Sequence, residues 1–326
     1  MKRFSLIFLG ALVMMIMAGC SKKNLQVTPD EDAWVDDLSL LVPIRFGSGA
    51  PLTKGQEISS LEGQTICLWG YDEEQGLSHA SCLFNAESFE VNGTQIETGE
   101  YYPMESIYNY SFYACSPVPE KAAYINDYGL CCYVALGDID YIHAMAAVEN
   151  GYNAKYVRAH GQPELAFKHV TASLSFKAMA NSNGGKYTDE DFKKVSVNSV
   201  TIKDVPTSGD FVIAGEKAGT VVINNYRASK EVFKGSENPT IDGTLLGEQC
   251  FLYPDADKTF EIVVSTTYSD LGDVPYETTF VTPELMPGKK YEFQILFHQP
   301  EMIKIELKDP EWDDNETHFF DTDPDE

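Results

Sequence analysis

The sequence predicts an all-β chain that folds as two β-sandwich domains. Short apolar or alternating runs recur along its 326 residues and are separated by Gly, Pro, Asn and Asp, which is typical of sandwich strands and their turns. No long run with helical spacing interrupts them. Because 43% of the residues are apolar, the chain can bury two separate cores.

The N-terminus predicts export. Lys2 and Arg3 precede an apolar run from Phe4 to Met17, which is short for a membrane-spanning helix and typical of a secretory signal. Ala18-Gly19-Cys20 resembles the bacterial lipobox, in which the cysteine is acylated and becomes the first mature residue. We therefore assign residues 1–19 to a lipoprotein signal peptide and 20–36 to a polar tether. An ordinary signal peptide with an incidental cysteine is the alternative.

The first domain, residues 37–163, is predicted to begin with an edge strand. Residues 37–46 alternate in polarity, and the side chains expected to face a core are Leu38, Leu40, Val42, Ile44 and Phe46. Pro43 lies on the other face and cannot donate to a ladder, which confines the strand to a sheet edge. Gly47-Ser48-Gly49 is expected to be flexible, so Arg45 becomes a candidate cleavage site. A plain exposed arginine that blunts edge aggregation is the alternative.

Further strands follow in the first domain. Residues 65–71 are apolar on both faces, as in a central strand. Asn92-Gly93 suits the turn of a hairpin, because both residues tolerate positive φ. Additional strands are predicted at 108–115, 130–136 and 138–144. The polar interval 149–163 is expected to connect the two domains.

The second domain, residues 164–312, is predicted to open with apolar positions at Phe167, Val170, Leu174 and Phe176. Thr188 is placed to cap a short helix over 189–194. Strands are expected at 195–202, 211–213, 221–223, 250–253, 260–266 and 278–281. The domain ends in a hairpin whose second strand carries Ile303, Ile305 and Leu307 at alternate positions. The acidic residues 313–326 are expected to be largely disordered.

Charge and motif content exclude several functions. The net charge of −26 repels phosphate backbones, which excludes nucleic acid as a partner and leaves a lipid as the means of membrane attachment. The sequence has no G-x-S-x-G elbow, no H-E-x-x-H pair and no phosphate-binding glycine loop. The cysteines after Cys20 lack zinc spacing and are expected to be mostly buried free thiols, while His143 and His169 are expected in strands. We therefore predict no metal, no cofactor and no enzymatic activity; a hydrolase would need two opposed carboxylates across a cleft.

An ordered set of short segments resembles the Bacteroidales fimbrillin family. The similarity runs from Cys20 to about Trp312. Its segments in chain order are Ile44-Arg45-Phe46, Thr53-Lys54-Gly55, Leu68-Trp69-Gly70-Tyr71, Tyr101-Tyr102-Pro103-Met104, Tyr110-Ser111-Phe112-Tyr113-Ala114, Leu165-Ala166-Phe167-Lys168-His169, Leu174-Ser175-Phe176 and Pro287-Gly288-Lys289-Lys290-Tyr291-Glu292-Phe293. The resemblance implies two tandem transthyretin-like (Greek-key) β-sandwich domains. It also implies a structural or adhesive subunit of surface fimbriae of the type V pilus class, located in the outer membrane, at the cell surface or in the fimbrium.

The family mechanism implied by this resemblance is strand exchange. A trypsin-like protease removes the leader and first strand, and a strand from another subunit fills the groove. By position, Arg45 matches the processing site best and Lys54 is the second candidate. Residues 21–24 lack the acidic residues expected after the lipidated cysteine of surface-displayed lipoproteins in these bacteria.

The candidate donor strand carries Ile303, Ile305 and Leu307, and its alternative is an ordinary closing strand of the second domain. The expected partners are other fimbrial subunits, the processing protease, and a host protein or glycan ligand. The alternative function is a surface glycan-binding lipoprotein that stays monomeric.

Overall fold

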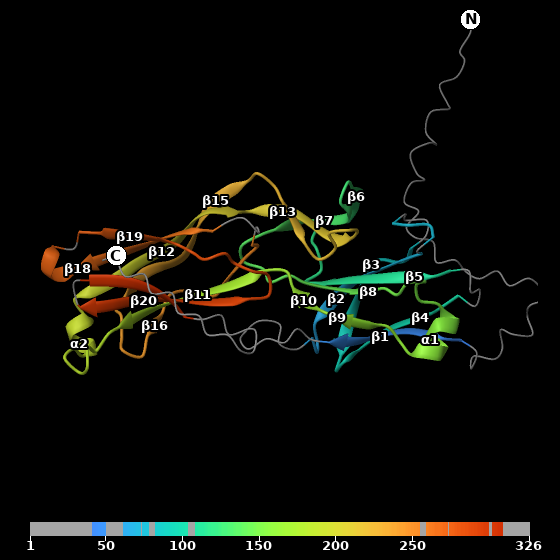
Figure 1. The fold of residues 1–326 in the computed structure, drawn as a ribbon, viewed down its shortest axis with the longest axis horizontal. Coiled ribbons are helices and arrows are strands. Elements are labelled where there is room, and N and C mark those ends of the chain that lie inside the picture. The colour runs from blue at the N-terminus through green and yellow to red at the C-terminus, as the bar shows by residue number, and fades with distance from the viewer. Residues whose placement is uncertain are drawn as a thin grey trace, which may run out of the picture.

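A computed structural model describes residues 41–49, 61–72, 74–77, 82–103, 108–254, 259–272, 274–299 and 302–308. The described chain is all-β, as predicted, and its strands form four sheets in an elongated molecule (Figure 1). No helix in these ranges is both long enough and apolar enough to span a membrane.

The largest sheet has eight strands and dominates the first half of the chain. Its order is β10 (Lys168–His169), β8 (Ile142–Ala146), β5 (Tyr110–Ser116), β2 (Thr65–Asp72), β3 (Cys82–Asn92), β4 (Gln95–Tyr101), β1 (Pro43–Gly49) and β9 (Glu164–Ala166). One core contains side chains from both ends of this order, including Phe46 of β1 and Ile142 of β8. Because strands distant in the sheet share this core, the sheet is strongly curved around it.

A second, smaller sheet covers the other face of β2 and β5. Its order is β14 (Val221–Ile223), β13 (Ser208–Ala214), β7 (Gly129–Ala135) and β6 (Tyr124–Asn126). Cys67 and Trp69 of β2 meet Phe211 of β13 in the core between the two sheets. β2 is therefore buried on both faces, as its uninterrupted apolar run predicts.

The second half contains two further sheets. One has β16 (Thr244–Leu245) and β17 (Cys250–Leu252) beside β11 (Ala172–Ala180), followed by β20 (Lys290–Gln299) and β21 (Met302–Lys308). The other has the order β15 (Arg227–Glu237), β12 (Val195–Pro206), β18 (Glu261–Tyr268) and β19 (Tyr276–Val281). Alternate side chains of both sheets fill one core, in which Phe176 stacks on Phe293 with ring centroids 5.3 Å apart.

The sheets cross the boundary predicted between residues 163 and 164. β9 pairs with β1 and β10 pairs with β8, so the segment 164–169 completes the large sheet. The hairpin β13–β14 lies between β12 and β15 in the sequence, yet β13 pairs with β7 of the first half (Figure 1). Alternation identifies a strand without identifying its partner, because the pattern depends only on which face is buried.

Two short α-helices and one 3-10 turn, η4 (Ser269–Leu271), complete the described part of the fold. α2 (Asp189–Phe192) begins after Thr188, as predicted, and the carboxylate of Asp191 accepts the Thr188 backbone N–H at 2.8 Å. α1 (Ala154–His160) lies in the interval that we predicted only as a connection. Its N-cap is Asn153, whose side chain accepts the backbone N–H of Tyr156 at 2.8 Å. An asparagine before a short helix-forming segment was a usable signal.

Candidate functional site

The candidate site is β1 together with the core that it closes. Val42, Ile44 and Phe46 are buried, with exposed fractions of 7%, 0% and 1%. The Phe46 ring meets Phe112 of β5 edge-on, at a centroid distance of 4.8 Å. These three positions face the core, as the alternation predicts. Leu38 and Leu40, assigned to the same face, lie outside the described residues.

The ladder between β1 and β4 is irregular. Pro43 is opposite Tyr101 and Arg45 is opposite Glu97, so β4 has extra residues between these two pairs. The bulge contains Gly99, whose φ of 73° favours glycine. The carbonyl of Ile44 instead accepts the Thr98 hydroxyl at 2.7 Å. The sequence contained the glycine, but strand alternation alone does not predict where a ladder bulges.

Two expectations for β1 are corrected. First, β1 is not a plain edge strand, because β9 runs parallel to it and pairs with Gly47, Ser48 and Gly49. Only the stretch before Gly47 has a single paired strand, and there Gln162 donates to the Pro43 carbonyl at 3.1 Å. Second, the Gly47-Ser48-Gly49 segment, expected to be flexible, is part of the strand, which spans 43–49 rather than 37–46. Pro43 is the first residue of the strand, a position that proline tolerates.

Arg45 is exposed on the outer face of β1. Its Nε lies 2.8 Å from a carboxylate oxygen of Glu97, and about half of each side chain is accessible. An exposed pair of this kind contributes little stability, ~0.2–1 kcal/mol. Its peptide bond lies in a paired strand, so cleavage there requires the strand to open locally. Lys54 and Cys20, the other candidate processing and lipidation residues, lie outside the described residues.

The candidate donor strand is β21, which pairs with β20 in the described chain. Ile303, Ile305 and Leu307 are opposite Phe297, Ile295 and Phe293, respectively. β20 is the single strand that pairs with β21 among the described residues, so β21 lies at the rim of its sheet. This arrangement corresponds to the closing strand that we gave as the alternative to donation.

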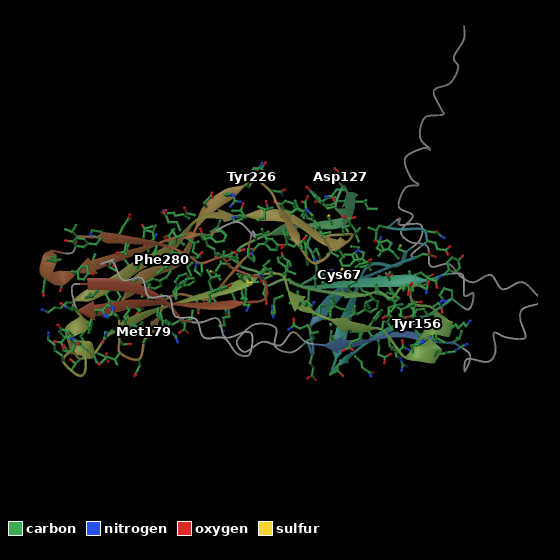
Figure 2. All side chains as sticks on the ribbon, viewed as in Figure 1. Cys67, Asp127, Tyr156, Met179, Tyr226 and Phe280 are labelled. Carbon is green, nitrogen blue, oxygen red and sulfur yellow. The ribbon has the colours of Figure 1, made fainter. Side chains whose placement is uncertain are left out.

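The interior of the first half contains unreactive thiols and histidines. Cys67, Cys115 and Cys132 are buried and free, and burial raises the pKa of Cys67 and Cys132 to about 12. Figure 2 shows Cys67 in the interior of the first half, near the middle of the molecule. These thiols are protonated at neutral pH and behave as small apolar groups. No cluster of three or more potential metal ligands occurs among the described residues.

His143 and His169 lie in strands, as expected, and both are buried. His143 of β8 makes a hydrogen bond of 2.8 Å between its Nε2 and the carbonyl of Ile213 on β13. Burial lowers the pKa of His143. His169 of β10 lies with its Nδ1 3.0 Å from a carboxylate oxygen of Asp140, which also accepts the Thr171 hydroxyl at 2.6 Å. Both histidines therefore have structural partners inside the fold.

Comparison with known proteins points to one family. The model of the family described as fimbrillin-like matches residues 59–312. A fimbrial protein from Bacteroides vulgatus superimposes with a TM-score of 0.55 at 10% identity, covering 83% of this chain and 99% of that one. A "putative cell adhesion protein" from Bacteroides uniformis gives a TM-score of 0.54 at 13% identity, with 82% and 96% covered. At such identities the likeness shows the fold alone. No curated protein matches the chain.

Proposed function

This chain belongs to the fimbrillin-like family, and on that premise we propose that it is a structural or adhesive subunit of surface fimbriae that assembles by strand exchange. In this proposal a trypsin-like protease cuts after Arg45 or Lys54 and releases the leader. The N-terminal strand then leaves the first half, and a strand from another subunit replaces it. The proposed sandwiches are transthyretin-like, with the β13–β14 hairpin joining them.

The burial of β1 supports this proposal. Fully burying one such side chain contributes ~1.5–3 kcal/mol, so Val42, just before β1, and Ile44 and Phe46 within it together contribute roughly 5–9 kcal/mol. A domain is stable by only ~5–15 kcal/mol. Cleavage after Lys54 releases Val42, Ile44 and Phe46, whereas cleavage after Arg45 releases Val42 and Ile44 and leaves Phe46 as the new first residue. Departure of these buried side chains leaves an apolar groove that favours a replacement strand. The released edge of β4 supplies the main-chain partners for that strand.

The position of β21 supports its role as the donor. A strand at the rim with one paired neighbour can leave by breaking one ladder, whereas an interior strand must break two. Ile303, Ile305 and Leu307 repeat the spacing of Val42, Ile44 and Phe46, so both triplets can present three side chains to the same groove.

Export follows the same proposal. Acylation of Cys20 would hold the precursor at the outer membrane, with residues 20–36 as a tether, until processing frees it for the fimbrium. The expected partners are other fimbrial subunits, the protease, and a host protein or glycan.

Limited trypsin treatment of the folded chain tests the mechanism. We expect a new N-terminus at Phe46 or Gly55, and a ladder of oligomers that resists SDS without heating. A chain with Arg45→Ala and Lys54→Ala should remain whole and monomeric. Ile305→Asp should be cut normally yet form no ladder, because a carboxylate cannot enter an apolar groove without a large desolvation penalty.

The outcome that contradicts strand exchange is cleavage that yields a stable monomer or only degradation. A ladder that persists in the Ile305→Asp chain would retain exchange and exclude β21 as the donor.

A further inference from the structure

The sheet β15-β12-β18-β19 has two edge strands, and they differ in how they are protected against pairing with another chain. β15 pairs with β12 alone among the described residues, and its register shifts at three places along that ladder. Charged side chains also recur along β15, from Arg227 to Glu237. Bulges and charges are the devices by which proteins prevent an edge strand from adding to a second sheet. β15 is therefore a protected edge.

β19 lacks these devices. It pairs with β18 alone in the described part of the chain, over Tyr276–Val281, without a register shift. Glu277 is its single charged residue, and the strand contains no lysine and no proline. Figure 1 shows β19 at the end of the molecule that is remote from α1. A regular edge of this kind is a site to which another strand can add.

The ladder identifies the main-chain groups of β19 that face outward. Thr282, directly after the strand, donates its backbone N–H to the Phe260 carbonyl at 2.8 Å. Because the direction of the main-chain groups alternates along an antiparallel strand, every second residue counted back from Thr282 faces β18. Glu277, Thr279 and Val281 therefore direct their N–H and C=O groups away from β18.

Two prolines limit the length of this free edge. Pro275 and Pro283 flank β19 at positions that also face outward, and proline has no N–H to donate. The outward donors between them are those of Glu277, Thr279 and Val281. Thr279 lies midway between the two prolines, so the free edge is symmetric about it.

Exposed apolar side chains gather along the same edge. Leu271, Val274, Tyr276 and Val281 are each between 43% and 61% exposed. All four lie on β19 or on the connection that leads into it from β18. Single exposed apolar residues are normal on a protein surface, whereas several in one short segment are typical of an interaction site.

From these observations we propose that β19 pairs with β19 of a second copy of this chain, antiparallel and about a two-fold axis through Thr279. The two Thr279 residues then lie opposite each other, which is a favourable cross-strand pair. Each Glu277 lies opposite Val281 of the other copy, so the carboxylates do not face each other. The outward groups of Glu277, Thr279 and Val281 form roughly six hydrogen bonds between the copies.

The prolines favour this register over its neighbours. The next register in one direction places Val281 opposite Pro275, and the next in the other direction places Glu277 opposite Pro283, so in each case a main-chain carbonyl loses its donor. The same surface meets itself across the axis, which gives a closed pair. The pairing uses neither β1 nor β21 and is separate from strand exchange.

Sedimentation velocity of the uncleaved full chain tests this pairing. We expect a reversible monomer–dimer equilibrium with a Kd of ~50 µM, because one short paired edge is at the small end of protein interfaces. No strand is exchanged in this dimer, so SDS dissociates it and the uncleaved chain still runs as a monomer on a denaturing gel.

Two lysine substitutions on the same exposed face of β19 distinguish the proposed register. Thr279→Lys places two ammonium groups directly opposite each other and should weaken the dimer by roughly 10-fold or more. Val281→Lys places an ammonium group opposite Glu277 of the other copy and should keep the Kd within about threefold, since the new ion pair offsets the lost apolar contact. Both side chains are exposed, so neither substitution disturbs the core.

Thr201→Lys on β12 is the matched control. Thr201 is opposite Val263, which in turn is opposite Thr279, so the control adds the same charge in the same cross-strand row but away from the edge. Its Kd should stay within about twofold of the parent value.

The proposal is overturned if the uncleaved chain stays monomeric up to about 500 µM. It is also overturned if Thr279→Lys associates like the parent chain, or if Val281→Lys weakens association as much as Thr279→Lys does. Because no protease is present, each of these outcomes is independent of whether strand exchange occurs.

Discussion

Two strands close the two cores of the first half, and they are held in different ways. β1 fills the core on one face of β2, and β13 fills the core on the other face. Both carry fully buried aromatic side chains, Phe46 on β1 and Phe211 on β13. β13, however, comes from within the second half of the sequence, whereas β1 precedes the rest of the fold.

Close backbone contacts at two glycines hold β13 against β7. A Cβ at Gly129 would overlap the Ala214 carbonyl oxygen, and a Cβ at Gly215 would overlap the Tyr128 carbonyl oxygen. The two glycines thus let the end of β13 and the start of β7 lie against each other without side chains between them. The His143 hydrogen bond to Ile213 adds a side-chain contact to β13.

Among the described residues, β1 makes no equally close backbone contact at a glycine. Its ladder to β4 is bulged, and a Cβ at Gly47 would come no closer than 3.6 Å to its nearest neighbour, the Glu164 side chain. β1 is held by side-chain burial and by main-chain ladders to β4 and β9, and a replacement strand of the same alternation can reproduce both. Under the proposed mechanism, burial alone does not distinguish the strand that leaves, β1, from the strand that stays, β13, whereas close backbone packing does.

The largest expected effect comes from truncating the two aromatic anchors. Phe46→Ala and Phe211→Ala should each lower the free energy of unfolding by ~3–5 kcal/mol, because each leaves a cavity in a closed core. Urea denaturation measures this loss. Under native conditions, Phe46→Ala should also speed trypsin cleavage after Arg45, because it loosens β1 itself. Equal acceleration by Phe211→Ala would contradict the local opening of β1.

A smaller but more discriminating effect comes from two glycines. Gly129→Ala should destabilise the protein by ~2–4 kcal/mol, because it adds overpacking to an unfavourable backbone, with φ at 117°. Gly47→Ala is the matched control and should change stability by less than about 0.5 kcal/mol, since its nearest contact is of ordinary length. Thermal unfolding of both variants measures the difference. If the two substitutions had similar effects, close backbone contacts would not distinguish β13 from β1.

The sequence predicted the strands better than their partners. The alternation of Val42, Ile44 and Phe46 gave the buried face of β1 correctly, and the apolar run of β2 gave a central strand. Pro43 was taken to confine this strand to a sheet edge, but it is only the first residue of β1, and the parallel strand β9 pairs further along. Alternation did not reveal β9, because it depends on burial and not on which main chain lies alongside. Gly99 and Gly129 were visible as glycines, but the close approach that requires Gly129 exists only in the folded chain.

The junction was the hardest part to predict. The segment 149–163 was expected to separate two domains, yet the chain returns to the first half through β13 and β14 after building part of the second. The bulge at Val232 in β15 and the close approach of Gly247 to the Val232 carbonyl oxygen were likewise not predicted. Both are long-range features without a local sequence pattern.

The smallest expected effect is a pH dependence of stability that arises from the His143 contact to β13. Burial holds the pKa of His143 below its usual value in the folded chain, so on acidification the unfolded chain binds a proton that the folded chain does not. Stability should therefore fall as the pH drops through ~6.5. His143→Gln retains an amide that can donate to the Ile213 carbonyl but does not titrate. Between about pH 7.5 and 5.5, urea denaturation should show the parent chain losing more stability than this variant. Equal losses of unfolding free energy in the two chains would mean that the contact between β8 and β13 tolerates a charged imidazole. The close contacts at Gly129 and Gly215 would then be what holds β13 in place.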